Sequence, residues 1–341
     1  MKTTLNLLRG LAASGLTAAG LAIALAPGLP APAAAESMTL NLADVLPDSN
    51  FMVTAEKQFA DRVAEITEGR VTITVLAGGA LGFKGPELLT AVRDGLVPMA
   101  NMPGVQQNGE DRIFDTEGLP FLVNNQEELA TLHTYLRPAF DKVAESYNQK
   151  FLYLVPTPAQ FLYTNVKTDN LDGLANLKAR AGDKSGVDVL NALGLAGIFM
   201  PWGEVIPALA SKRVDAVLTS ATSAVDGRFW EFLDYIYLVN GTGLSHIVTI
   251  NLDTWNRISA EDQAAIEALA TELQPEFWAL SAAQGTDALK VLEENGMSVI
   301  EYPAEMRAEI LDRTRPLLDE KLAGMPDSQP IVAEYLKAVG R

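Results

Sequence analysis

Residues 39–76 read TLNLADVLPDSNFMVTAEKQFADRVAEITEGRVTITVL. At the start, over residues 39–42, polar and apolar side chains alternate as they do along a strand. A helical stripe follows, in which apolar side chains recur every three or four residues: Phe51, Ala55, Phe59, Val63 and Ile66. This spacing predicts a helix over residues 51–67, and residues 71–76 form the next predicted strand.

The alternation of strands and helices continues beyond this segment. Gly85 and Pro86 predict the start of a helix that runs through Val92, because proline suits the first helical turn. A third strand is predicted at residues 97–102. The order β-α-β-α-β is typical of a parallel sheet, so the sequence predicts an α/β protein.

A second alternating block and a long helix complete the predicted elements. The remaining strands are predicted at residues 151–155, 178–181, 198–200, 216–219, 235–239, 247–252 and 298–301. The remaining helices are predicted at residues 125–149, 184–193, 204–211, 259–285, 304–322 and 330–339. Pro138 puts the first of these helices at risk of a break, and Pro275 is expected to kink the long one. The strands at 235–239 and 247–252 are expected to return the chain to the first block.

The composition is that of an ordinary globular protein, and it excludes several classes. A length of 341 residues corresponds to about two domains. With 43 acidic and 26 basic residues, the formal charge of −17 argues against a surface that binds nucleic acid through its phosphates. The absence of cysteine excludes disulfide bonds and thiolate metal sites.

The first 35 residues have the character of a secretory signal peptide. Lys2 and Arg9 precede an apolar run over residues 11–26, which is too short for a spanning helix and is followed by an A-x-A pattern at residues 33–35. We expect cleavage after Ala35 and release of the mature protein into a periplasm. The alternative is an uncleaved amino-terminal membrane anchor.

Motifs for catalysis are incomplete in this sequence. The loop at residues 78–85 stands where a phosphate loop would stand, but its lysine precedes a glycine and no serine or threonine follows. Residues 182–186 are one position out of step with the Gly-x-Ser-x-Gly nucleophile elbow. Both histidines, His133 and His246, are expected to be structural. The sequence therefore predicts a protein that is not an enzyme and that uses no cofactor, and it offers no set of metal-ligating residues.

Short motifs spread over nearly the whole mature chain resemble those of one known family. They are FADRV (59–63), TEGRV (67–71), GALG (79–82), VRDG (92–95), GLPFL (118–122), LANLKAR (174–180), MPWGEV (200–205) and VDA (214–216). In their order and spacing they resemble the DctP-type solute-binding proteins of tripartite ATP-independent periplasmic (TRAP) transporters.

This resemblance implies a two-lobed periplasmic binding protein fold, with a mixed sheet in each lobe, crossing hinge segments and a long helix that spans both lobes. Lobe I is expected to comprise residues 36–157 and about 246–284, and lobe II about 158–245 and 285–341. It also implies that the protein captures a small organic carboxylate by hinge closure and delivers it to TRAP membrane subunits. The chain is expected to act as a monomer. The alternative is a periplasmic ligand sensor that feeds a signalling partner.

The resemblance assigns the ligand's carboxylate to Arg180, which ends the LANLKAR motif. A guanidinium is a planar fork that matches a carboxylate and stays charged when it is desolvated. Two positions depart from the family: Gln160 stands where many relatives carry a further arginine, and Thr219 where they often carry an asparagine. Glu204 is expected at a helix amino terminus rather than at the ligand, because a second buried anion would repel a carboxylate.

Further ligand contacts are expected from the loops that face the cleft. The apolar and aromatic candidates are Phe83, Met102, Phe161, Tyr163, Trp202, Phe229 and Trp230. The polar candidates for the other end of the ligand are Asn50, Gln106, Gln107 and Asn240. One permanent positive charge among apolar side chains favours a monocarboxylate with an apolar or aromatic body.

Overall fold

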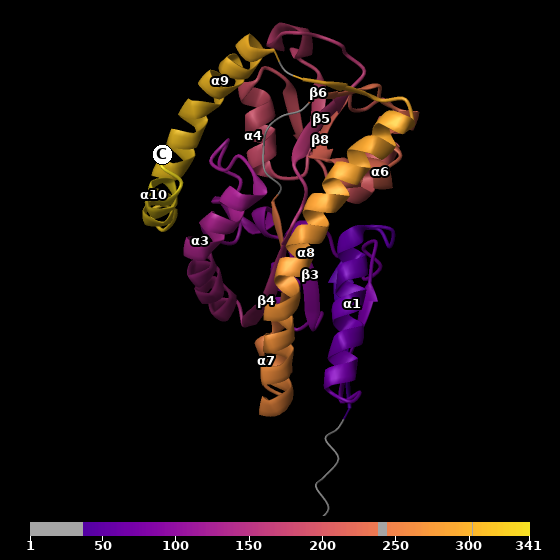
Figure 1. The fold of residues 1–341 in the computed structure, drawn as a ribbon, viewed down its shortest axis with the longest axis vertical. Helices are drawn as coiled ribbons and strands as arrows, with labels where there is room; N and C mark the ends of the chain where they lie inside the picture. The colour runs from indigo at the N-terminus through magenta and orange to yellow at the C-terminus, as the bar shows by residue number, and fades with distance from the viewer. Residues whose placement is uncertain (1–36, 238–243, 302) are drawn as a thin grey trace, which may run out of the picture. The chain divides into compact units, whose positions relative to one another are not determined.

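Two mixed β-sheets with helices packed around them organise the chain (Figure 1). The computed structural model describes residues 37–237, 244–301 and 303–341. In these ranges strands and helices alternate, so the predicted α/β class is confirmed, and so is the mixed sheet in each lobe. The predicted signal peptide lies outside the described residues.

The first sheet has the strand order β2-β1-β3-β10-β4. Its strands are β1 (Met38–Asp44), β2 (Val71–Leu76), β3 (Met99–Pro103), β4 (Gln149–Pro156) and β10 (Ser245–Asn251). β1 pairs in parallel with β2 and β3, as the β-α-β-α-β pattern predicts. β10 comes much later in the chain but lies between β3 and β4, antiparallel to both. Every residue of β10 is buried, as expected of a central strand.

The helices that pack with this sheet include α1 (Phe51–Ile66), α2 (Leu88–Arg93), α3 (Gln126–Ser146) and α7 (Leu252–Trp255). α1 begins at Asn50, whose side-chain oxygen accepts a hydrogen bond from the Met52 N–H at 3.0 Å. α3 continues through Pro138 without a break, as one long helix. The helix buries Leu136 and Phe140 in a hydrophobic core formed with the first sheet, called the first core below. This packing stabilises the helix on both sides of the proline.

The second sheet has the strand order β11-β9-β5-β8-β6-β7. Its strands are β5 (Gln160–Thr164), β6 (Lys178–Ala181), β7 (Ala196–Phe199), β8 (Ala216–Ser220), β9 (Tyr235–Tyr237) and β11 (Ser298–Ile300). Its helices are α4 (Lys184–Ala192), α5 (Val205–Ala210) and α6 (Ala221–Asp226). β6 runs parallel to β7 and β8, whereas β5 runs antiparallel to β8 and β9. The carboxyl ends of β6 and β8 therefore lie at the same edge.

α8 (Ala260–Glu294) contacts both sheets' cores, which confirms the long lobe-spanning helix. Its first half packs on α1 and β4 through residues such as Leu273 and Phe277. Its second half packs on α6 and places Ala288 and Leu292 in a hydrophobic core formed with the second sheet, called the second core below. Figure 1 shows α8 running from beside β4 to beside α6. The helix passes through Pro275 and continues beyond the predicted end at residue 285.

The carboxyl-terminal helices connect the two sheets a second time. α9 (Ala304–Ala323) packs on α4, and α10 (Ser328–Ala338) packs on α3 (Figure 1). Val332 and Tyr335 lie in the first core, and the Tyr335 hydroxyl donates to the Leu122 carbonyl at 3.1 Å. The end of the segment 285–341, which the sequence assigns to lobe II, therefore packs with the first sheet, because α10 has an apolar face that α3 covers.

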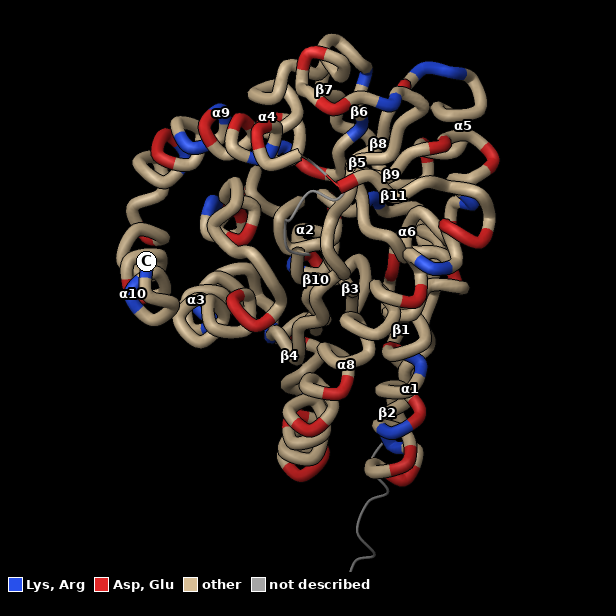
Figure 2. Tube along the Cα trace, turned by 45° about the horizontal axis from the view of Figure 1, so that its top comes forward, with Lys and Arg blue, Asp and Glu red and all other residues tan. Residues whose placement is uncertain are grey.

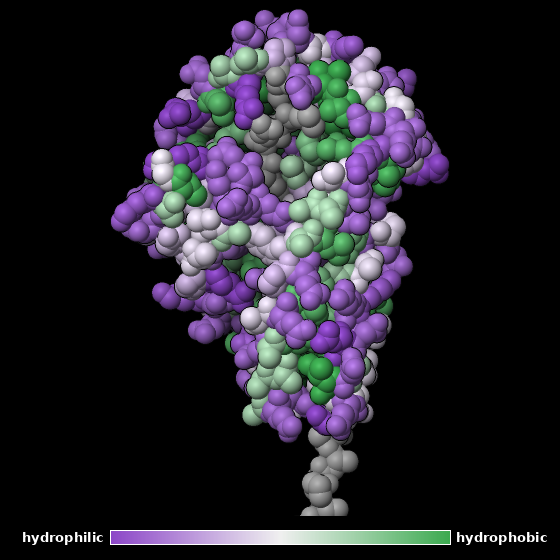
Figure 3. Space-filling model, viewed as in Figure 1, coloured by the Kyte–Doolittle hydropathy of each residue, from purple (hydrophilic) through white to green (hydrophobic). Residues whose placement is uncertain are grey.

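Charge is concentrated on the outer helices. Figure 2 shows mainly acidic residues along α8, whereas β3 and β10 carry no charged residue. Hydrophilic residues cover most of the face seen in Figure 3, between small hydrophobic patches. No helix in the described ranges is long and apolar enough to span a membrane.

Candidate functional site

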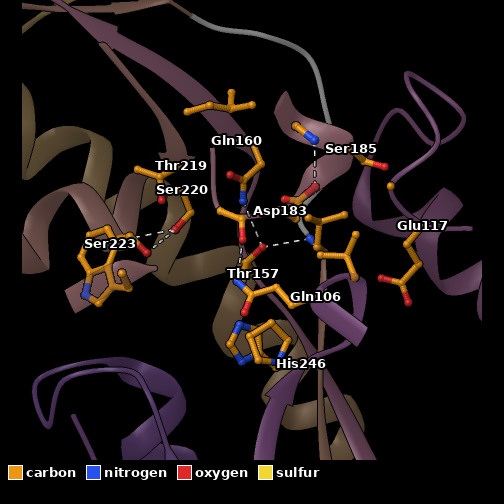
Figure 4. Close-up of a pocket in the computed structure, with 18 of the residues that line it drawn as sticks. Gln106, Glu117, Thr157, Gln160, Asp183, Ser185, Thr219, Ser220, Ser223 and His246 are labelled. Atoms are coloured by element: carbon orange, nitrogen blue, oxygen red, sulfur yellow. Dashed lines mark hydrogen bonds between the residues drawn. The ribbon is translucent and has the colours of Figure 1, made fainter. Parts of the chain in front are cut away.

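A cavity of ≈ 210 Å³ has walls from both sheets (Figure 4). The first sheet contributes residues at or after the ends of β1 and β3 and one residue of β10: Val45, Leu46, Pro103, Val105 and His246. The second contributes residues at or next to the ends of β5, β6 and β8: Gln160, Arg180, Gly182, Thr219 and Ser220. Strand ends at a sheet edge are where α/β proteins place their ligands, so this cavity is the candidate site.

Arg180, on β6, is the only lysine or arginine among the described residues that line the cavity. It is 4% exposed, and burial lowers the pKa of its guanidinium to about 10, against the attraction of Asp183. Nε donates a hydrogen bond to the Met200 carbonyl at 2.9 Å, and the guanidinium carbon lies 5.9 Å from the Trp202 ring centroid. Within the described ranges, its close partners are carbonyls and a ring, and no carboxylate forms an ion pair with it.

Gly182 leaves the space that this guanidinium occupies. A Cβ atom at residue 182 would lie 3.1 Å from one terminal nitrogen of Arg180 and 3.4 Å from the other. The carbonyl of Gly182 accepts a hydrogen bond from Nε2 of Gln106 at 2.7 Å. The segment Arg-Ala-Gly at 180–182 therefore supplies both the charge and the room beside it.

Two buried carboxylates also line the cavity, and both have partners in the protein. Asp183 caps α4, accepting from the Gly186 N–H at 2.8 Å, and burial raises its pKa. Glu117 accepts from the Ser245 N–H at 2.7 Å, and its Oε1 lies 2.9 Å from Nε2 of His133. Burial pushes the pKa of Glu117 upward, but His133 and these hydrogen bonds outweigh burial and hold the pKa below its ordinary value.

Six of the predicted contact residues line the cavity: Asn50, Gln106, Gln160, Arg180, Trp202 and Thr219. Nε2 of Gln160 donates to Oγ1 of Thr157 at 3.4 Å, as Figure 4 shows. The side chain of Asn50 is engaged at both ends, since its oxygen caps α1 and its nitrogen donates to Asp226 at 2.6 Å. The structure therefore brings together the predicted cation and a set of uncharged polar groups.

Three of the predicted contacts lie outside the described cavity wall: Tyr163, Met102 and Phe83. Tyr163 is fully buried in the second core, with its ring perpendicular to Phe229 at 5.2 Å between centroids. Successive side chains of β5 point to opposite faces, so Gln160 faces the cavity and Tyr163 faces the core. Met102 lies inside the first core, and Phe83 packs against that core.

The remaining candidates do not contribute to the described cavity wall. Asn240 lies outside the described residues. Gln107 is buried, and its Nε2 donates to two main-chain carbonyls at 2.9 and 3.1 Å, which gives it a structural role. Phe161 and Phe229 are in the second core, and Trp230 packs against it.

Polar contacts connect the two cavity walls. Oγ of Ser185 donates to Oδ1 of Asp115 at 2.6 Å, and Nζ of Lys321 donates to the same serine at 3.0 Å. All three residues are buried. Nearer the surface, Lys84 pairs with Glu204 at 3.1 Å. Glu204 stands at the start of α5, at a helix amino terminus as predicted.

Among the lining residues that sequence reasoning missed are three that can titrate: Glu117, Asp183 and His246. Asp183 follows β6 closely, so its position after a parallel strand was a usable signal. Glu117 and His246 carried no such signal, because only the pairing of β10 with β3 brings them to the cavity. No cluster of histidine and acidic side chains in the described ranges has the arrangement of a metal site.

Comparisons with known proteins agree with this architecture. The family model described as "Bacterial extracellular solute-binding protein, family 7" (DctP) matches residues 42–324. A periplasmic protein of Nostoc sp., named as binding monocarboxylate 2-oxoacids, is 26% identical over 72% of this chain and 69% of its own length.

Two solved structures show the same fold. A TRAP solute-binding protein from a marine metagenome, described as specific for pyroglutamate, is 26% identical with a TM-score of 0.84, over 89% of this chain and 99% of that one. DctP7 of Bordetella pertussis, described as a receptor that binds pyroglutamic acid, is 23% identical with a TM-score of 0.85, over 88% of this chain and 100% of that one.

Proposed function

We propose, from the premise that the chain belongs to family 7 of the bacterial extracellular solute-binding proteins, that it is the extracytoplasmic subunit of a TRAP transporter. In this role it binds a small organic carboxylate without turnover and delivers it to membrane subunits. It works in the periplasm as a monomer, after cleavage behind Ala35.

The observation that carries this proposal is the buried guanidinium of Arg180. A buried charge costs free energy unless an opposite charge compensates it. The carboxylates nearest in the cavity wall, Asp183 and Glu117, already have partners of their own. A ligand carboxylate can accept two parallel hydrogen bonds from the guanidinium and neutralise it.

The balance of charge around the cavity favours a monocarboxylate. Arg180 faces two acidic side chains, and Gln160 and Thr219 add no charge. A ligand with two carboxylates would leave one of them without a cation. The Nostoc relative is named for monocarboxylate 2-oxoacids, and the metagenome protein for pyroglutamate, which is also a monocarboxylate.

Hinge closure follows from the placement of the walls. Lobe I is proposed to comprise residues 36–157 and about 246–284, with α10 packed against it, and lobe II about 158–245 and the rest of residues 285–341. A ligand that contacts both walls stabilises the closed arrangement by its difference in affinity for the closed and open states. The loaded, closed form is the one that the membrane subunits receive.

A thermal-shift screen against small organic acids, followed by titration calorimetry, tests the proposal. A ligand at about a hundred times its Kd adds about 2.7 kcal/mol, which raises the Tm by a few degrees for a chain of this size. Arg180→Ala should weaken binding by about 2–5 kcal/mol, and Arg180→Lys should restore part of this, because lysine keeps the charge but not the fork.

Arg228→Ala is the matched control. The guanidinium of Arg228 also lies 5.9 Å from a tryptophan ring, that of Trp230, but it is exposed and outside the cavity. Its removal should leave the affinity unchanged. A screen in which no acid raises the Tm, or an Arg180→Ala protein that binds as the wild type does, would contradict the proposal. Gene neighbours for a kinase in place of membrane subunits would favour the sensor.

A further inference from the structure

The cavity wall built from the first sheet contains a histidine that has no hydrogen-bond partner in the described part of the chain. His246 lies in β10, paired with Pro103 of β3 and Val155 of β4, and lines the cavity next to Gln106 (Figure 4). Arg180 reaches the cavity from the second sheet. A ligand whose carboxylate binds Arg180 therefore presents its other end toward the wall that holds His246.

The two histidines of the chain differ in their contacts. Nε2 of His133 lies 2.9 Å from both Oγ of Ser245 and Oε1 of Glu117, so that ring is held by the protein. His246 is 6% exposed, has no hydrogen-bond partner among the described residues, and its Nδ1 is fully buried. A buried polar ring without a partner is unfavourable, and a ligand in the cavity can supply the missing partner.

The ring of His246 is neutral at neutral pH. Burial lowers its pKa to about 4, against the attraction of Glu117. A neutral imidazole carries one N–H. We assign this proton to Nε2, because Nδ1 is enclosed without an acceptor and an orphaned N–H costs more than an orphaned lone pair. Nε2–H is then the donor that His246 offers.

The same wall offers no positive charge. Arg180 is the only lysine or arginine along the described lining, and Glu117 adds a negative charge near His246. A second carboxylate on the ligand would meet a neutral ring and the repulsion of Glu117. An uncharged oxygen at this end can instead accept the N–H of the ring.

We propose that His246 determines specificity at the end of the ligand remote from Arg180, where it donates a hydrogen bond to an uncharged oxygen such as an amide or ketone carbonyl. The inference rests on the proposed function, because it takes the carboxylate to lie on Arg180. It names the substrate class as monocarboxylates that carry a neutral carbonyl on an apolar body. A site built to hydrogen-bond such a group discriminates strongly against analogues without it.

Titration calorimetry at neutral pH, with the protein purified after export, tests this inference with four probes. They are pyroglutamate, its carbocyclic analogue in which CH₂ replaces the ring N–H, cyclopentanecarboxylate, which also lacks the carbonyl, and the dicarboxylate glutarate. The wild type should bind the first two with similar affinity and the last two at least about tenfold more weakly. His246→Phe should bring the carbocyclic ketone and cyclopentanecarboxylate within about twofold of each other.

His246→Gln is the conservative variant, and its amide N–H should preserve most of the preference for the ketone. His246→Asn, whose shorter amide retreats from the cavity, is a second loss variant in case the phenylalanine protein does not fold. His133→Gln is the matched control outside the cavity and should leave the ratio between probes unchanged. Far-UV circular dichroism and the Tm establish that each variant is folded.

The outcomes separate this inference from the proposed function. If His246→Phe and His246→Asn discriminate between the ketone and cyclopentanecarboxylate as the wild type does, His246 does not set specificity, while a weakened Arg180→Ala protein still supports the proposed function. If Arg180→Ala binds every probe as the wild type does, the proposed function is wrong. A wild type that binds no carbonyl-bearing probe, or that prefers glutarate, overturns the inference.

Discussion

Acidification should destabilise the ligand-free protein through His246. The ring is buried and neutral in the folded chain, but it takes up a proton readily once the chain unfolds. Its pKa is 6.5 in a model compound and about 4 in the folded chain. Because the folded value is depressed, the unfolded chain binds more protons, so this stability is fully present above pH 6.5 and is lost as pH falls toward 4.

The size of the loss follows from these two values. Their difference, 6.5 − 4, is about 2.5 units and corresponds to about 3.4 kcal/mol when the titration is complete. About 2 kcal/mol of this is lost between about pH 7.5 and about pH 5, and about 3 kcal/mol by about pH 4. Against a typical total stability of about 5–15 kcal/mol, this is a measurable share.

Urea unfolding followed by tryptophan fluorescence gives the free energy of unfolding at each pH. The matched variant is His246→Gln, because an amide can donate a hydrogen bond but does not titrate. The wild type should lose about 2 kcal/mol more than this variant between about pH 7.5 and about pH 5. Glu117 does not contribute in this window, because its pKa is lowered from 4.5 and its proton uptake comes at more acid pH. Parallel curves for the two proteins would refute the reasoning.

The remaining predictions concern two other buried groups. Burial and the neighbouring Asp44 raise the pKa of Glu56, so ionisation of this residue costs stability as pH rises above 4.5. Glu56→Gln should therefore stabilise the protein by about 1–3 kcal/mol at neutral pH, and urea unfolding should show that this gain shrinks toward acid pH. A variant that is less stable than the wild type at every pH would contradict this. The hydroxyl of Tyr163 is buried and has no hydrogen-bond partner among the described residues. Tyr163→Phe should therefore change the free energy of unfolding by less than about 1 kcal/mol and leave the ligand affinity unchanged. A large loss of affinity in calorimetry would show that Tyr163 contributes to ligand binding.

Local periodicity was sufficient to predict most of the elements. The strands at 71–76 and 178–181 and the helix at 51–67 agree with β2, β6 and α1 to within a residue, because neighbouring residues alone set these patterns. The position of β10 between β3 and β4, and of α10 against α3, could not be predicted in this way. These contacts depend on which apolar surfaces meet, and a period contains no information about that.

Site residues were predictable where a sequence motif marked them. They were not predictable where only their burial in the folded chain identifies them. Arg180, Trp202 and Thr219 came from motifs or their neighbours, and all three line the cavity. Tyr163 and Met102 were expected at the ligand but lie in hydrophobic cores, because a strand's period of two defines its two faces without saying which one faces a cavity. His246 was missed because a single histidine in an apolar strand has the same sequence pattern whether it lies in a core or in a binding site.

The central position of β10 also controls when the molecule can fold. Residues 245–251 are synthesised after β5 to β9, yet they fill the gap between β3 and β4. A nascent chain that ends before residue 245 therefore has two strand edges in its first sheet without a partner. Such long-range pairing makes folding slow, and it postpones completion of the first core until most of the chain exists.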